Sequence, residues 1–136
     1  MTGNVTTSID LSLPNIWYSW QKFRRGKKRS PELEYFLYYL EDNLFRLHAD
    51  LNSGTYRHGG YRVFYVTDNK KRRIAVASIR DRVVHRLLYE YLVSLYDKTF
   101  IRDVWSCRKN KGLLGAIERT QHLLKTYSKS FIWRSD

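Results

Sequence analysis

The sequence predicts an α+β fold that is mostly helical and contains one antiparallel β-hairpin. Apolar residues recur at helical spacing after residue 30 and again after residue 78, which predicts two amphipathic helices. Between them, two β-type runs, Tyr61–Thr67 and Ile74–Ala77, flank a polar turn, which predicts a hairpin over about residues 61–77. The chain of 136 residues is long enough for one domain with a modest core.

The first 29 residues are expected to form an N-terminal extension. Residues 1–13 are small and polar, and the aromatic-rich segment at 14–23 favours a short helix or a lid. The run RRGKKR at 24–29 forms a basic loop. Two interpretations of this loop stay open, namely contact with RNA or DNA and a solvated linker.

A long helix is expected from residue 31 to about residue 51. Ser30 suits the N-cap, Pro31 suits the first helical position, and acidic residues in the first turn complement the helix dipole. One face of this helix is apolar and is expected to lie in the core: Leu33, Phe36, Leu37, Leu40, Leu44 and Leu47. Tyrosines between these positions either widen the core face or stack on nucleic-acid bases.

Four consecutive cations follow the turn of the predicted hairpin: Lys70, Lys71, Arg72 and Arg73. The hairpin is therefore expected to have a charged tip and an apolar base. Such a tip either holds a polyphosphate or a nucleic-acid backbone, or it is simply a solvated surface, as charge runs usually are.

A second helix is expected after the hairpin, capped by Ser78 or Asp81 and apolar on one face. Three arginines lie near its start: Arg80, Arg82 and Arg86. These arginines either grip phosphates beside the free amide groups of the helix start or form salt links. An example of such a link is Arg86 with Glu90, at i, i+4.

Histidines and the single cysteine are interpreted as structural residues. Asp81 and His85 share one helix turn, and such a pair alone is more typical of structure than of acid–base catalysis. His48 and His58 lack the spacing of metal ligands. Cys107 is the only cysteine, so an internal disulfide is excluded, and we expect it to be buried.

The last third of the chain is expected to contain a basic connection, a helix and a strand. The connection at residues 100–112 carries three cations: Arg108, Lys109 and Lys111. A helix over about residues 113–127 is expected to bury four aliphatic side chains: Leu113, Ile117, Leu123 and Leu124. Residues 130–135 favour a buried strand, and Asp136 at its end is well placed for a metal ligand.

The net charge of +12 comes from 25 basic and 13 acidic side chains. Residues 69–136 hold most of the excess, with 16 basic and 6 acidic side chains. A field of this sign favours a polyanionic partner. No apolar run reaches the roughly 18 residues of a transmembrane helix, and the N-terminus lacks the pattern of a signal peptide. We therefore expect a cytoplasmic protein without membrane contact.

Three motifs occur in order: Phe64-x5-Lys70-x-Arg72-x-Ile74, Asp81-Arg82-Val83-Val84-His85 and Cys107-Arg108-x2-Lys111-Gly112. In this order and spacing they resemble the N-terminal, fingers part of a bacterial reverse transcriptase. The resemblance is greatest to enzymes of diversity-generating retroelements, with retron and group II intron enzymes as close relatives. It covers roughly residues 45–136, and a preceding motif, Leu51-x2-Gly54-Thr55-Tyr56, resembles the corresponding lead-in of group II intron enzymes.

The resemblance implies that residues 30–129 form the fingers region of an RNA-directed DNA polymerase. The hairpin would then fold over the incoming nucleotide, with Lys70 and Arg72 on its triphosphate. Arg82 would lie near the template strand or lock the fold. The later basic group would lie along the template: Arg108, Lys109 and Lys111.

The resemblance also implies that residues 130–136 begin the palm, whose first catalytic aspartate would be Asp136. That carboxylate would bind Mg²⁺ in the intact enzyme, while no cofactor is expected for this polypeptide alone. The implied partners are template RNA, an RNA–DNA hybrid and a deoxynucleoside triphosphate. Self-association through an exposed palm edge is a further expectation.

Some features depart from the family pattern. Asn69 and Asn110 stand where the family usually has proline and glycine, and the sequence has no paired-aspartate motif. One carboxylate cannot hold two metal ions, so we expect this polypeptide alone not to polymerise DNA. Two alternatives stay open: a standalone basic RNA-binding module without catalysis, and a protein-interaction domain whose charge serves solubility.

Overall fold

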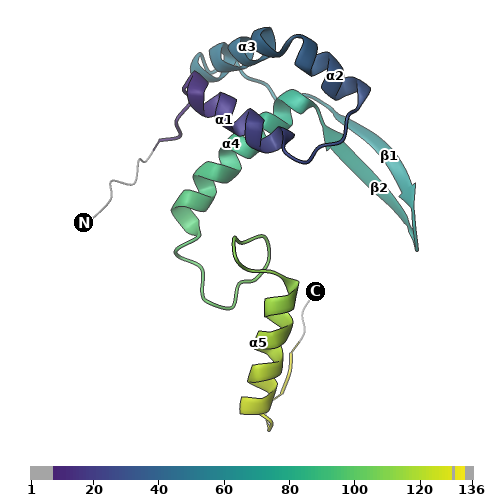
Figure 1. Ribbon diagram of the computed structural model, residues 1–136, viewed down its shortest axis with the longest axis vertical. Coiled ribbons are helices and arrows are strands. Elements are labelled where there is room, and N and C mark those ends of the chain that lie inside the picture. The colour runs from purple at the N-terminus through teal and green to yellow at the C-terminus, as the bar shows by residue number, and fades with distance from the viewer. Residues whose placement is uncertain (1–7, 130, 134–136) are drawn as a thin grey trace. The chain divides into compact units, whose positions relative to one another are not determined.

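The computed structural model describes residues 8–129 and 131–133. Within these residues it contains five helices and one two-stranded antiparallel sheet, which confirms the mostly helical α+β fold (Figure 1). The elements are α1 (Leu13–Arg24), α2 (Pro31–Tyr38), α3 (Leu40–Asn52), β1 (Tyr61–Thr67), β2 (Lys71–Ala77), α4 (Ile79–Tyr96) and α5 (Leu113–Thr126). The chain divides into two compact units, Met1–Ser94 and Leu95–Asp136. None of the helices in the described ranges is long and apolar enough to cross a membrane.

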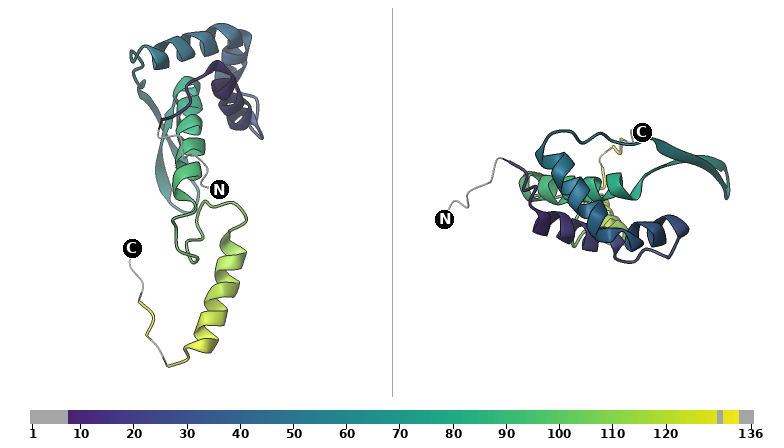
Figure 2. Two further views of the ribbon diagram at one scale, coloured as in Figure 1. Left: turned by 90° about the vertical axis from the view of Figure 1, so that its left-hand side faces the viewer. Right: turned by 90° about the horizontal axis from the view of Figure 1, so that it is seen from above.

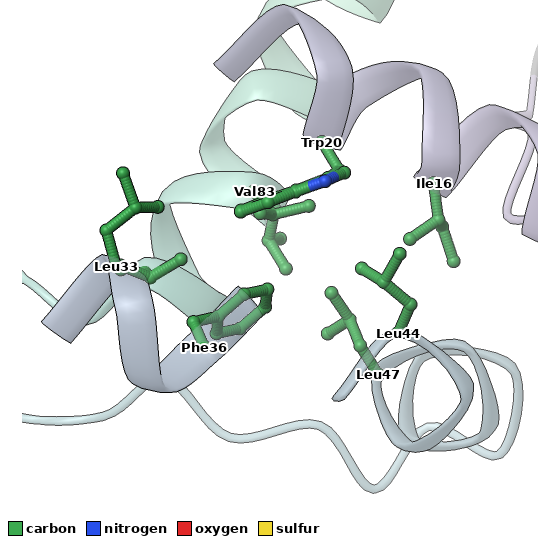
Figure 3. Close-up of a cluster of buried hydrophobic side chains, with 9 residues drawn as sticks. Ile16, Trp20, Leu33, Phe36, Leu44, Leu47 and Val83 are labelled. Atoms are coloured by element: carbon green, nitrogen blue, oxygen red, sulfur yellow. The ribbon is translucent and has the colours of Figure 1, made fainter. Parts of the chain in front are cut away.

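The core of the first unit is built by the four helices α1 to α4. Trp20 of α1 stacks on Phe36 of α2, with ring centroids 4.9 Å apart (Figure 3). Val83 of α4 lies beside these rings, and Leu47 of α3 is fully buried in the same cluster. The boundary expected at residue 29 therefore falls inside this unit, because α1 supplies part of the core.

The prediction of one long helix between residues 31 and 51 is wrong in one respect, because this segment forms two helices, α2 and α3. Tyr39 leaves helical geometry, with φ −108° and ψ 34°. The side-chain amide of Asn43 donates a hydrogen bond to the carbonyl oxygen of Phe36 across the break (3.1 Å). The change of direction lets Phe36 reach the indole of Trp20 while Leu44 faces Ile16 (Figure 3).

The hairpin projects from the helices of its unit (Figures 1 and 2). Its strands pair in register from Tyr61 opposite Ala77 to Thr67 opposite Lys71. Most side chains on both faces are exposed, and only Ala77, at the base, is buried. An isolated two-stranded hairpin is marginally stable in water, so its attachment at the base determines its position.

The second unit differs from the prediction because α5 buries none of its residues. Leu113 is 79% exposed, and Ile117 and Leu124 are also exposed. A helix can bury an apolar stripe only against another packed element, and the described neighbours of α5 within its unit are irregular segments. Cys107 is exposed as well, so the expectation of a buried cysteine is also wrong.

The expected strand at the C-terminus is absent at residues 131–133, which have no regular structure. A strand needs a neighbouring strand for its backbone hydrogen bonds, and the sheet among the described residues contains only β1 and β2. Asp136 and the other terminal positions of this prediction, residues 130 and 134–135, lie outside the described residues.

The core predicts the effect of removing a side chain from α3. Leu47 is fully buried, so Leu47→Ala is expected to lower the free energy of unfolding by about 2–5 kcal/mol, from lost burial and the cavity left behind. Chemical denaturation followed by circular dichroism measures this change. The control is Arg46→Ala on the exposed side of the same helix, expected within about 0.5 kcal/mol of wild type. Equal effects of both substitutions would contradict the assigned core.

Candidate functional site

Asp81 is a buried carboxylate that fixes the base of the hairpin. Only 1% of the residue is exposed. It accepts hydrogen bonds from the Tyr56 hydroxyl (2.7 Å), the Gly59 backbone N–H (3.1 Å) and the Ser78 hydroxyl (2.7 Å). Gly59 precedes β1 and Ser78 follows β2, so one side chain ties both ends of the hairpin to α4.

The sequence explains this arrangement locally. The Ser78 side chain accepts a hydrogen bond from the Asp81 backbone N–H (3.2 Å), so Ser78 caps α4 as one of the two predicted alternatives. A Cβ atom at Gly59 would lie 3.0 Å from the carboxylate. Glycine therefore permits the close approach of the loop to Asp81.

These hydrogen bonds also set the protonation states of the pair. Burial raises the pKa of Asp81, but hydrogen bonds from Tyr56, Ser78 and Gly59 outweigh it and hold the pKa below its ordinary value. Burial, together with the hydrogen bond to Asp81, raises the pKa of Tyr56. At neutral pH the pair is therefore an ionised carboxylate and a neutral phenol.

The arginines at the start of α4 form ion pairs: Arg80 with Asp50, Arg82 with Glu32 and Arg86 with Glu90. The salt-link alternative for Arg86 is thus confirmed. Glu32 also accepts a hydrogen bond from the Ile79 backbone N–H (3.1 Å), so it connects α2 to the first turn of α4. Arg82, a predicted template contact, is held by Glu32 and lies over the Phe23 ring.

The predicted triphosphate ligands lie at the tip of the hairpin. Lys70 is the last residue of the loop, and Arg72 lies within β2 opposite Val66, because β2 begins earlier than expected, at Lys71. Both side chains are exposed. Among the described residues, no carboxylate lies within ion-pair distance of either one. They are therefore accessible to an anionic ligand.

The two faces of the hairpin carry different groups, because alternate residues of a strand point to opposite faces. One face combines Arg62 and Arg72 with apolar side chains. The other presents two tyrosines and two cations: Tyr61, Tyr65, Lys71 and Arg73. On that second face the Lys71 ammonium lies 4.7 Å from the centre of the Tyr65 ring.

The second predicted basic group, in the unit that begins at residue 95, has a largely structural environment. Arg108 pairs with the Asp97 carboxylate (2.8 Å) and donates to the Asp97 carbonyl oxygen (2.8 Å). This contact lowers the pKa of Asp97. Lys111 donates to the Arg102 carbonyl oxygen and lies over the Trp105 ring, whereas Lys109 is exposed.

A contact that the sequence did not reveal joins His58, in the loop before β1, to His85 of α4. Their Nε2 atoms lie 3.1 Å apart. Twenty-seven positions separate the two residues, so no local periodicity could predict the pairing. The only available signal was that His85 ends the Asp81-Arg82-Val83-Val84-His85 motif and that His58 lies two residues after Tyr56 of the preceding motif.

A magnesium site is the remaining predicted feature. Within the described residues, no group of three or more His, Cys, Asp or Glu side chains could hold a metal ion. The predicted ligand, Asp136, lies outside those residues. The described side chains therefore do not fit the two-ion centre of a polymerase.

No family model matches the chain, and no curated protein sequence matches it significantly. The resemblance to reverse transcriptases therefore rests on the motifs and their order.

Asp81 generates a prediction with a defined pH dependence. Asp81→Asn removes one acceptor from buried donors and is expected to lower the free energy of unfolding at pH 7 by about 1–3 kcal/mol. The folded pKa is lowered, so the stabilisation is present above the unfolded value of about 3.9 and is lost as pH falls through the folded value. The difference between wild type and variant should therefore shrink in acid.

Urea unfolding between neutral and acidic pH measures this difference. The matched control is Asp68→Asn in the exposed hairpin turn, which should change stability by less than about 0.5 kcal/mol. A stability gap for Asp81→Asn that stays constant with pH would contradict the anchoring role of the ionised carboxylate.

Proposed function

We propose that this chain is the fingers region of an RNA-directed DNA polymerase, which holds template RNA and the triphosphate of the incoming nucleotide. The observation that supports this function most strongly is the hairpin. Its tip presents Lys70 and Arg72 without carboxylate partners among the described residues, while Asp81 fixes its base. Exposed cations on an anchored projection suit an anion that arrives from solvent.

The chemistry of nucleotide transfer explains why such a hairpin is useful. Negative charge develops on the leaving pyrophosphate, and cations placed there stabilise the transition state. A hairpin that closes over the nucleotide places these cations beside the pyrophosphate only when substrate is present. The ordered hydrogen bonds at Gly59 and Ser78 provide the fixed end of this motion.

The basic residues divide into two groups under this proposal. Arg82 and Arg108 are held by carboxylates, which favours a role in holding the fold, and binding a phosphate would require them to exchange partners. Lys109 is exposed and is the better candidate for a contact with template RNA or an RNA–DNA hybrid. Catalysis needs paired aspartates that the sequence does not contain, so the proposal assigns binding, not chemistry, to this polypeptide.

A second candidate function is a standalone RNA-binding module. The observation that favours it is the tyrosine-bearing face of the hairpin, where Tyr61 is 58% exposed and Tyr65 is 60% exposed. Exposed aromatic rings beside cations bind unpaired bases by stacking and phosphates by charge. This function would need neither a nucleotide nor a metal ion.

The polyphosphate role is tested with two charge-matched double variants. Lys70→Ala with Arg72→Ala is expected to weaken the binding of inorganic tripolyphosphate about tenfold or more, because two charge-assisted contacts are lost. Lys71→Ala with Arg73→Ala removes the same charge and should weaken binding less than about threefold. Chemical-shift titration of the hairpin amides measures both affinities.

In an intact polymerase that contains this region, the first double variant should raise the KM for nucleotide. Equal losses in both double variants would mean that only net charge matters, and unchanged affinity and kinetics in the first would contradict the assigned role of Lys70 and Arg72.

RNA binding makes a separate prediction. Single-stranded RNA of mixed sequence should bind the chain with an affinity that falls steeply with salt, with a slope of log K against log salt of about −0.7 for each phosphate contacted. Fluorescence anisotropy at several salt concentrations measures this slope, with Tyr61→Ala and Tyr65→Ala as probes of base stacking. If no RNA is retained at low salt, the protein-interaction alternative is favoured instead.

A further inference from the structure

His58 and His85 form a hydrogen bond whose direction the geometry determines. His58 Nδ1 lies 2.6 Å from the Gly59 carbonyl oxygen. A carbonyl oxygen can only accept, so Nδ1 carries the hydrogen and Nε2 of neutral His58 is an acceptor. The hydrogen between the two Nε2 atoms, which lie 3.1 Å apart, therefore belongs to His85.

The arrangement of the rings favours a shared proton over a metal site. The planes differ by 17° and the centroids lie 5.2 Å apart, so the two Nε2 atoms face each other along the line between the rings. A zinc ion would need two bonds of about 2.0–2.1 Å. Zinc also needs further ligands beyond two histidines, and the described residues contain no group of three or more His, Cys, Asp or Glu side chains that could hold a metal ion.

We propose that His58 and His85 are positioning residues that fix the direction of the hairpin as long as at most one of the two rings is protonated. Protonation of both rings releases the hairpin. The consequence for nucleotide holding rests on the proposed function, but the latch itself does not. Asp81 and His85 lie one turn apart on the same side of α4. Asp81 holds Gly59, and His85 holds the adjacent His58. Asp81 holds both ends of the hairpin at its base, and the contact between His58 and His85 adds an attachment one turn further along α4.

The protonation steps follow from the donor and acceptor roles. The first proton binds His85, whose Nε2–H already donates to His58, so the bond becomes charge-assisted. The second proton must bind Nε2 of His58, where it would face the N–H of His85 with a like charge. The contact then opens, and the ring of Tyr61, stacked on His58 at 5.1 Å, loses its fixed neighbour.

Charged or titratable groups lie on each element beside the pair. On α4 the Asp81 carboxylate lies one turn before His85 and interacts electrostatically with His58. On β1 the neighbouring titratable group is Tyr61. In the loop, Arg57 donates to the Tyr56 carbonyl oxygen. Asp81 attracts the first proton, while the imidazolium that forms opposes the second.

The test is a titration of all four histidines in the full 136-residue chain, followed by NMR from about pH 9 to about pH 4. His58 and His85 should titrate as a coupled pair. His48 of α3 and His122 of α5 are the internal controls. Backbone relaxation of the hairpin amides should report greater mobility below the second step of the pair.

Two variants separate positioning from stability. His85→Ala should increase hairpin mobility at every pH, whereas His122→Ala should match wild type. Independent single steps for His58 and His85, or unchanged hairpin mobility in His85→Ala, would overturn the proposal; the wild-type titration decides the matter even if that variant does not fold. Neither readout uses phosphate, so a coupled titration together with absent tripolyphosphate binding would reject the nucleotide role and leave the latch intact.

Discussion

The Asp81 carboxylate accepts hydrogen bonds from three donors that lie before the hairpin, after it and in the loop that leads to it. A buried charge is tolerated only when its oxygens are satisfied, so these contacts constrain one another. Ser78 caps α4 directly after β2 ends at Ala77, and a Cβ atom at Gly59 would lie 3.0 Å from the carboxylate, so a side chain there would crowd it. The start of α4 and the base of the hairpin therefore form one structural unit.

The positive charge of the chain has two physical roles. Arg80, Arg82 and Arg86 are paired with carboxylates and connect α4 to α3, to α2 and to its own next turn. The cations of the hairpin tip have no such partners among the described residues. Surface ion pairs contribute little to stability individually, but they show which arginines are already engaged and which cations remain for a polyanion.

The buried apolar residues are unevenly distributed among the elements. Nearly all buried side chains belong to α1 through α4, whereas the hairpin and α5 leave many apolar groups exposed. For the hairpin, exposure is compatible with a role in contacting ligands, because it is attached at its base alone. The stripe on α5 has the pattern of a core face, although this helix buries none of its residues.

The sequence by itself determined the elements whose causes are local. The Ser30 cap, the turn between β1 and β2, and the apolar periodicity of α4 each depend on residues a few positions apart. The prediction failed at Tyr39, because the need to pack Phe36 against Trp20 outweighed continuous helical periodicity. Only the tertiary structure decided that Arg80 pairs with Asp50 and Arg82 with Glu32, that Asp81 holds Gly59, and that His58 meets His85. These contacts join residues 22 to 50 positions apart. Local sequence patterns cannot predict such pairs, because packing of the core determines which distant side chains meet.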